Sequence, residues 1–303
     1  MQTLRLKLSV LFCAALFPLA AHAGGGGMLR ISCEGDAEGA AVTINGKFKG
    51  DCPMDVGVPA GTLNIRVVKA VDSEHEREFT QTVRMGDDVV KMIDVSLGES
   101  KISAAQRQKR AAEALQRLPS NMVAIPNTRY EMGKYEVTQA LWQAVMGSPP
   151  PELRFTDCDD TCPVESVSWN DIQVFLQKLK AKTGKNYRLP TESEWQTACL
   201  AGNQTEYCGG NDLNAVAWYD DNSGNTTHPV GQKQPNAYGL YDMSGNVREW
   251  MQDCSDSGCG ERVLRGGSWF NYLSQNLRAA YRYSFVPSVR DYFIGFRLAR
   301  TLP

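Results

Sequence analysis

The segment that decides the fold runs from Asn236 to Trp250 and reads NAYGLYDMSGNVREW, and Arg262–Trp269, RVLRGGSW, follows it closely. Both combine glycine and asparagine, which favour turns, with large apolar side chains that favour burial. Gly, Asn, Asp and Pro recur from Cys208 onward. We therefore predict a loop-rich domain in this half of the chain, and the lack of a long internal repeat argues against solenoids and propellers.

The composition is that of a globular protein large enough for two domains. The chain has 303 residues, of which 42% are hydrophobic and 22% are charged. These proportions allow a buried core and argue against wholesale disorder. The formal net charge of −2 gives no reason to expect a nucleic acid or an anionic membrane as partner.

The first 23 residues have the pattern of a signal peptide. Arg5 and Lys7 form a positively charged start, Leu8–Leu19 is apolar, and Ala21–Ala23 offers small residues for cleavage. The apolar run is too short for a comfortable membrane span. We predict cleavage after Ala23 and a periplasmic or secreted protein with no integral membrane segment afterwards.

Cysteine usage agrees with an oxidising compartment. Nine cysteines minus Cys13 of the leader leave eight, which follow one another as four neighbouring couples: Cys33 and Cys52, Cys158 and Cys162, Cys199 and Cys208, Cys254 and Cys259. An even number at short spacings in an exported chain favours disulfides, although the spacing leaves their connectivity open. The alternative is a zinc site at Cys158 and Cys162, for which the mature chain offers only His75 and His228 as nitrogen ligands.

Residues 28–97 read as a small all-β domain. Leu29–Ser32 and Ala41–Ile44 alternate as half-buried strands do, and Asn45-Gly46 is typical of a tight hairpin. Together with Gly50–Pro53 and Val58–Leu63, this arrangement resembles the PEGA domain, a β-rich accessory module of bacterial envelope proteins. The resemblance implies no catalysis. A Cys33–Cys52 bridge would join two neighbouring strands.

Residues 98–119 are predicted to form a helical linker, and residues 120–303 a second domain. Ser103 and Gln106 have the spacing of a capping box at the start of the linker helix. In the second domain, apolar spacing and N-cap residues predict three helices: Thr138–Met146, Asp171–Thr183, and a helix that begins after Thr191 with Glu194 at the capping-box position.

Four blocks of the second domain carry a family resemblance. Three of them are MGKYEVTQALW at Met132–Trp142, PVESVSW at Pro163–Trp169 and YRLPTESEW at Tyr187–Trp195. The fourth consists of Asn236–Trp250, which we call the opening segment, of Arg262–Trp269, and of IGFRL at Ile294–Leu298. In this order they resemble the formylglycine-generating enzyme, or sulfatase-modifying factor, family. The resemblance spans nearly all of residues 120–303 and implies an α+β, C-type-lectin-like fold, preceded here by the small all-β module.

The family's oxidase chemistry requires two cysteine thiolates that bind Cu(I). The resemblance places these positions at Asn271 and Asn276, and Phe270–Asn276 contains no cysteine. Carboxamides bind Cu(I) poorly and cannot exchange disulfides with a substrate. Cys254 and Cys259 are the only candidates for a relocated pair. The family's iron enzymes require a histidine set that this chain lacks, so we expect no copper, no iron and no catalytic residue.

The resemblance also implies a structural calcium site at the opening segment. The matching oxygen donors are the side chains of Asp242 and Glu249 and the carbonyls of three residues between them, Met243, Gly245 and Val247. Oxygen-only ligation suits a hard cation. In the alternative interpretation, Asp242 and Glu249 only accept hydrogen bonds from the loop backbone.

Relatives bind a substrate peptide in a groove beside this segment. The resemblance places six residues there: Arg265, Ser268, Trp269, Arg278, Tyr281 and Arg282. Arginine and aromatic side chains together suit peptide or anion recognition. The same residues could also serve as buried ion pairs and core packing, and the sequence leaves this alternative open.

We interpret the chain as an exported, non-catalytic binding or regulatory protein whose second domain recognises a protein or peptide partner in the cell envelope. Family members that regulate envelope kinases or secretion systems are the nearest analogues. The alternative is a metal-dependent oxidase or tailoring enzyme of the formylglycine-generating and sulfoxide-synthase superfamily acting in the periplasm. Redox-metal content and oxygen consumption distinguish the two.

Overall fold

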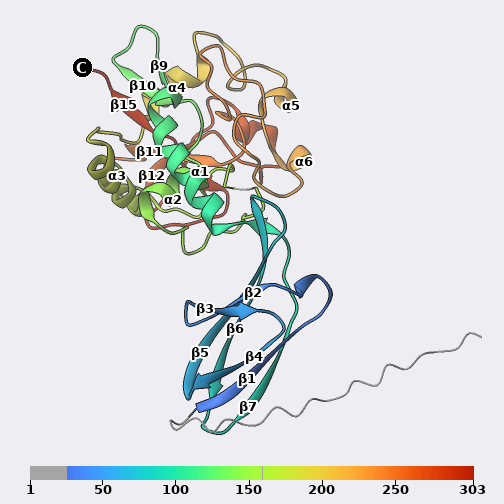
Figure 1. The fold of residues 1–303 in the computed structure, drawn as a ribbon. Helices are drawn as coiled ribbons and strands as arrows, with labels where there is room; N and C mark the ends of the chain where they lie inside the picture. The colour runs from blue at the N-terminus through green and yellow to red at the C-terminus, as the bar shows by residue number, and fades with distance from the viewer. Residues whose placement is uncertain (1–25, 159) are drawn as a thin grey trace, which may run out of the picture. The chain divides into compact units, whose positions relative to one another are not determined.

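The computed structural model describes residues 26–158 and 160–303, and it shows two compact units (Figure 1). The first comprises residues 26–71 and 76–100, and the second comprises residues 72–75 and 101–303. The predicted signal peptide, residues 1–23, lies outside the described residues. In the two described ranges, no helix combines the length and the apolar character that crossing a membrane requires.

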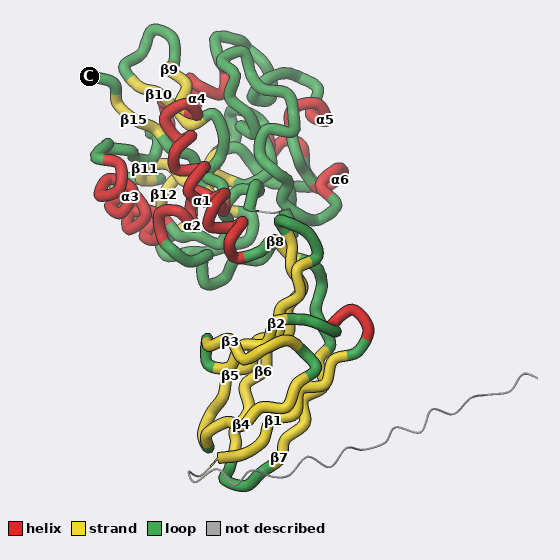
Figure 2. Tube along the Cα trace, in the orientation of Figure 1, coloured by secondary structure: helices red, strands yellow, loops and turns green. Residues whose placement is uncertain are grey.

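The first unit consists of two β-sheets. One sheet has the strand order β4-β1-β7, and in the other β3, β2, β5 and β6 lie side by side (Figure 2). The seven strands are β1 (Gly26–Cys33), β2 (Ala41–Ile44), β3 (Lys47–Asp51), β4 (Met54–Pro59), β5 (Gly61–Ala70), β6 (His75–Met85) and β7 (Val90–Val95), and a single 3-10 turn, η1 (Gly35–Ala37), follows β1. Alternating apolar residues of both sheets meet in one core, which makes the unit a small sandwich.

The predicted hairpin is present between β2 and β3. Asn45 and Gly46 both have positive φ, 50° and 75°, and this conformation suits the two-residue turn that the Asn-Gly pair predicts. Cys33, at the end of β1, is joined to Cys52 between β3 and β4. Leu29, Val67 and other alternate residues of the strands are almost fully buried.

The second unit begins with helices whose starts are set by local side chains. Ser103, Thr138, Ser168 and Thr191 each accept a hydrogen bond from a backbone N–H in the first turn of their helix. The helices are α1 (Ala104–Arg117), α2 (Gln139–Met146), α3 (Trp169–Thr183), α4 (Glu192–Leu200), α5 (Leu213–Val216) and α6 (Asp220–Ser223). Two 3-10 turns accompany them, η2 (Leu118–Asn121) and η3 (Ser274–Leu277).

Helix α1 is a packed element of the second unit instead of an isolated spacer. It contacts α2, and Ala114, Leu115 and the following Leu118 lie against the main apolar core. Arg110 pairs with Glu74, a residue that belongs to the same unit, at 2.9 Å. These apolar residues therefore hold α1 against the second unit.

Short strands and long loops complete the second unit, so its α+β class is confirmed. Two small sheets have the orders β15-β10-β9 and β13-β12-β11-β14. The strands are β8 (Lys101–Ile102), β9 (Met122–Ala124), β10 (Tyr130–Gly133), β11 (Arg248–Cys254), β12 (Arg262–Arg265), β13 (Tyr283–Phe285), β14 (Ile294–Gly295) and β15 (Ala299–Thr301). Between α6 and β11 the chain is irregular, as its turn-rich sequence predicts.

All four neighbouring cysteine couples are disulfides, which confirms the predicted use of cysteine. The bonds join Cys33–Cys52, Cys158–Cys162, Cys199–Cys208 and Cys254–Cys259. Four disulfides fit an oxidising compartment such as the periplasm or the cell exterior. Because Cys254 and Cys259 are joined to each other, neither is a free thiolate in this structure.

Candidate functional site

The opening segment is held in place by buried amide and hydroxyl groups instead of regular structure. Asn236 donates to the carbonyls of Ala198 and Cys199 at the end of α4, at 2.7 and 3.2 Å. Ser244 donates to the carbonyl of Leu277 at 2.9 Å. Asn246 donates to a carboxylate oxygen of Glu136 at 2.7 Å. These bonds connect the segment to polar groups of other elements that are shut off from water.

A buried ion pair lies at the end of the same segment. Glu249 and Arg297 are both 0% exposed, and Arg297 Nη2 donates to Glu249 Oε1 at 2.7 Å. Arg297 Nε donates to both carboxylate oxygens at 2.9 Å, and Trp195 Nε1 donates to Oε2 at 2.7 Å. The remaining Arg297 hydrogen bonds reach the carbonyls of three loop residues: Gly133, Lys134 and Tyr241.

Two further buried carboxylates, Glu136 and Asp242, share this region with Glu249 and leave it rich in negative charge. Burial raises the pKa of Glu136 well above its ordinary value, and the charges of Asp242 and Glu249 raise it further. Burial also raises the pKa of Asp242 from 3.8 to about 6, against a hydrogen bond from the Gly231 N–H and the charge of Arg297, which lower it. Glu136 and Asp242 thus favour a proton or a cation in this region.

Of the two carboxylates predicted to bind calcium, Asp242 has an oxygen available for a cation and Glu249 does not. Asp242 Oδ1 is buried without a hydrogen-bond partner, so it is available as a ligand, whereas Oδ2 accepts from Gly231 N. Both oxygens of Glu249 are engaged by Arg297 and Trp195, so Glu249 would act through its charge and not as a ligand. Within the described residues, no three His, Cys, Asp or Glu side chains are grouped as a metal site. Calcium therefore stays a prediction, with Asp242 and neighbouring carbonyls as its donors.

Calcium and pH are expected to act on stability together. Because the pKa of Asp242 is raised in the folded state to about 6, its stabilising contribution is present below about pH 4 and is lost as pH rises through about 6. A cation would replace the missing proton. At about pH 7.5, EGTA should therefore lower the melting temperature by about 5–10 °C. In protein freed of calcium by dialysis, added CaCl2 should change the melting temperature little at about pH 4.5, where EGTA itself no longer chelates calcium, and in Asp242→Ala it should have no effect at either pH. Equal melting curves with and without EGTA at pH 7.5 would remove calcium from this loop.

Asn271, at the position that the resemblance assigns to the oxidase's first cysteine, is buried and accepts hydrogen bonds. Asn271 Oδ1 accepts from Ser268 N at 2.9 Å, from Ser268 Oγ at 3.3 Å and from Arg248 Nη2 at 3.2 Å. Asn276 is half-buried in the adjacent 3-10 turn. A carboxamide in this setting positions neighbouring donors and offers no nucleophile.

The structure distributes the six predicted groove residues over interior and surface. Arg265, Ser268 and Trp269 are buried: Arg265 donates to the carbonyls of residues 279–281, and Trp269 packs in an aromatic cluster. Direct contact with a partner is thus not the role of these three side chains. Arg278 and Arg282 are exposed and paired with Glu206 and Glu192. Tyr281 is half-buried. The interpretation of this set as ion pairs and packing accounts for most of it.

An exposed aromatic surface lies beside Asn271 instead, and sequence reasoning missed it. Phe270 is 46% exposed, Tyr272 73% and Tyr283 38%. Phe270 stacks on Phe293 at a centroid distance of 5.8 Å, and Arg248 lies over the rings of Phe293 and Tyr283. We call these five residues the aromatic surface. Large exposed aromatic side chains at one place are typical of binding sites.

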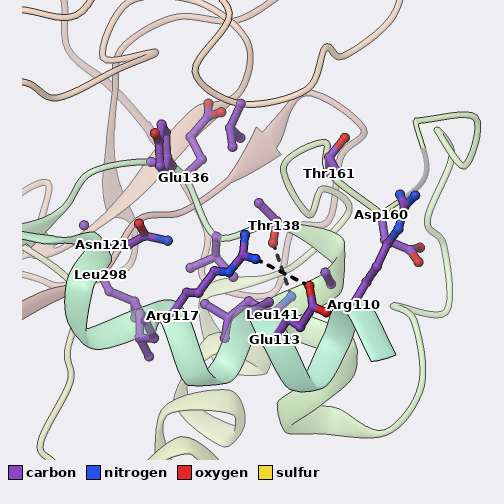
Figure 3. A pocket seen from close by; sticks show the side chains of 17 residues that line it. Arg110, Glu113, Arg117, Asn121, Glu136, Thr138, Leu141, Asp160, Thr161 and Leu298 are labelled. Atoms are coloured by element: carbon purple, nitrogen blue, oxygen red, sulfur yellow. Dashed lines mark hydrogen bonds and ion pairs between the residues drawn. The ribbon is translucent and has the colours of Figure 1, made fainter. Parts of the chain in front are cut away.

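A separate cavity of about 460 Å³ lies where α1 packs on the second unit (Figure 3). Its lining includes Arg110, Glu113 and Arg117 from α1. Glu136 and Leu141, from the part of the second unit that faces α1, also line it. Arg117 pairs with Glu113 at 3.7 Å. None of the cavity residues comes from residues 242–293, which include the whole aromatic surface. The cavity and the aromatic surface are therefore different places.

Comparison with known sequences identifies the family. Residues 78–302 match the Sulfatase-modifying factor enzyme 1-like domain, and residues 28–96 match the PEGA domain. The chain belongs to the sulfatase-modifying factor family and carries a PEGA domain before the family domain. The two matches overlap at β6 and β7. Because internal contacts assign residues 76–100 to the first unit, we place these strands in the PEGA domain.

Relatives in this family have different names and lengths. The chaperone protein LppX of Paenibacillus barcinonensis is 32% identical over 202 residues, which are 48% of this chain and 71% of that protein. Serine/threonine-protein kinase pkn1 of Chlamydia pneumoniae is 34% identical over 158 residues, 46% of this chain and only 24% of the kinase. The formylglycine-generating enzyme of Thermomonospora curvata is 32% identical over 198 residues, 54% of this chain and 62% of the enzyme.

The solved structure of Treponema denticola variable protein 1 is also similar. It is 30% identical to this chain, with a TM-score of 0.53, and the match covers 60% of this chain and 91% of that one. The fold predicted from the four blocks is thereby confirmed.

Proposed function

We propose that this protein is an exported, non-catalytic binding protein whose family domain recognises a protein partner through the aromatic surface. The observation that carries the proposal is at Asn271. Where the resemblance places a copper-binding cysteine, a carboxamide accepts hydrogen bonds from Ser268 and Arg248. The exposed rings of Phe270, Tyr272 and Tyr283 lie next to it and provide the apolar contact area of a binding site.

Two relatives support a role in protein recognition. One is named a chaperone, and the other is a protein kinase that includes a region similar to this domain. The PEGA domain and the four disulfides fit a protein of the bacterial envelope. We therefore place the partner in the envelope. In its specific form, the proposal is that this protein regulates an envelope kinase or a secretion system.

A test for catalysis separates this proposal from the oxidase alternative. The purified protein, incubated with Cu(I) and a cysteine-containing peptide, is expected to consume no oxygen and to retain no stoichiometric copper. The matched variant combines Asn271→Cys with Asn276→Cys, which restores two soft ligands, and it is expected to retain Cu(I). Oxygen consumption or bound redox metal in the unmodified protein would overturn the proposal.

A second test locates the partner contact. A photoreactive residue at Tyr272 should crosslink to a partner in intact cells, because that side chain is 73% exposed within the aromatic surface. The control places the same residue at Lys178, which is exposed on α3. Crosslinking at Lys178 and not at Tyr272 would place the contact elsewhere on the domain.

A further inference from the structure

Arg248 differs from the other buried arginines of the described chain. Three arginines are buried there: Arg248, Arg265 and Arg297. Arg297 is paired with Glu249, and Arg265 donates to three carbonyls and lies 3.8 Å from Glu192. Arg248 is 8% exposed, and in residues 26–158 and 160–303 no carboxylate lies within 4.0 Å of its guanidinium. A buried cation with no counter-ion is costly unless a ligand supplies one.

The three guanidinium nitrogens of Arg248 have different surroundings. Nη2 donates to Asn271 Oδ1 at 3.2 Å, which is the single side-chain hydrogen bond of this arginine among the described residues. Nε is shut off from solvent without a partner. Nη1 also has no hydrogen bond, but it is not among the buried unpaired atoms, so it reaches the surface. The free donor therefore points out of the protein beside Asn271.

Aromatic rings surround the guanidinium of Arg248 on one side. The guanidinium lies 4.9 Å from the ring centre of Tyr283 and 5.2 Å from that of Phe293. Phe270, stacked on Phe293, continues the apolar rim. Burial lowers the pKa of Arg248, and the charge of the half-buried Asp291 offsets this effect in part without forming an ion pair. The rings fix the orientation of the cation and exclude water from one side of it.

We infer that Arg248 binds a carboxylate side chain of the partner protein, with apolar partner residues on the aromatic rim. A carboxylate supplies the missing negative charge and accepts from Nη1 and from the second Nη2 hydrogen in the paired geometry that guanidinium groups favour. Asn271 acts as a positioning residue, because its Oδ1 holds Nη2 in place. The inference rests on the proposed function and adds the chemistry of the ligand: a segment in which an acidic residue adjoins aromatic ones.

Two peptides that differ in one group test the inference. The probes are acetyl-Phe-Glu-Phe-amide and acetyl-Phe-Gln-Phe-amide, whose blocked ends leave the glutamate side chain as the sole carboxylate. They are titrated into the full-length mature protein while the Nε–Hε NMR signal of Arg248 is followed. We expect the glutamate peptide to bind at least about tenfold more tightly and to shift this signal. Arg248→Gln should remove the preference. Arg300→Gln, which changes an arginine paired with Glu131, should keep it.

Each other outcome overturns the inference. Equal affinity for the two peptides would show that no carboxylate is recognised, and the proposed function would stand. A preference that survives in Arg248→Gln would place the carboxylate elsewhere, and no binding of either peptide would show that Arg248 and its rings do not bind such a segment. Because the NMR signal is read in the unmodified protein, the result holds even if Arg248→Gln fails to fold. Failure of the proposed function is seen separately, as oxygen consumption with cysteine peptides.

Discussion

Arg297→Ala is expected to lower the free energy of unfolding of the second unit by about 3–5 kcal/mol. Arg297 and Glu249 are both fully buried, so the substitution leaves the Glu249 carboxylate without its counter-ion beside two further buried acids, Glu136 and Asp242. It also removes donors from three loop carbonyls. Equilibrium urea unfolding followed by tryptophan fluorescence measures the effect. All six tryptophans lie in residues 142–269, so the signal reports on the second unit alone.

The matched control is Arg282→Ala. Arg282 also pairs with a glutamate, Glu192 at 2.9 Å, but its side chain is 41% exposed. Solvent screens such a pair, so the loss should stay within about 1 kcal/mol. If both variants lost equally little stability, the buried carboxylates of the opening segment would not depend on Arg297 as their counter-ion.

Gly245→Ala is expected to cost about 2–5 kcal/mol, because two penalties add. The backbone at Gly245 has φ of 87°, and an added Cβ would lie 2.3 Å from the carbonyl oxygen of Trp218. Relieving that overlap moves the loop and weakens the hydrogen bond from Asn246 N to the same carbonyl. The same fluorescence-detected unfolding measures the loss.

Gly239→Ala separates the two penalties. Gly239 lies in the same segment with a similar φ of 78°, but nothing stands within 4 Å of the added Cβ. This variant should show the conformational cost alone, about 1–2 kcal/mol. Equal losses in the two variants would show that the loop accommodates the methyl group and that the close approach to Trp218 has no structural importance.

Helix starts and the β2–β3 hairpin could be predicted because their causes are local. The hydroxyl of Ser168 or Thr191 caps a helix that begins at the next residue, and Asp171 or Glu194 completes the capping box three residues on. The predicted helix Asp171–Thr183 differs from α3 only in its first two residues. The packing of α1 on α2 was not predictable in this way, since it depends on residues that the chain brings together over a longer distance.

The candidate site was harder to predict because burial decides the role of each side chain. Glu249 was a reasonable calcium ligand by type, but Arg297, 48 residues later, occupies its oxygens. Trp269 and Arg265 were expected in a groove and are buried. Arg248 was not singled out, since its lack of a counter-ion and its contacts with rings of residues 283 and 293 exist only in the folded chain.

The buried amides and hydroxyls of the opening segment have a consequence for how such chains are classified. Asn236, Ser244 and Asn246 fasten loops, and none of them belongs to the aromatic surface. These three signature residues are thus architectural, whereas Arg248 of the same segment belongs with Asn271 and its exposed neighbours to the surface for which we propose binding. A substitution at position 271 leaves the hydrogen bonds of Asn236, Ser244 and Asn246 in place, because none of them involves that residue. Assigning an activity within this family therefore requires inspecting residues 270–283 together with Arg248 and Phe293.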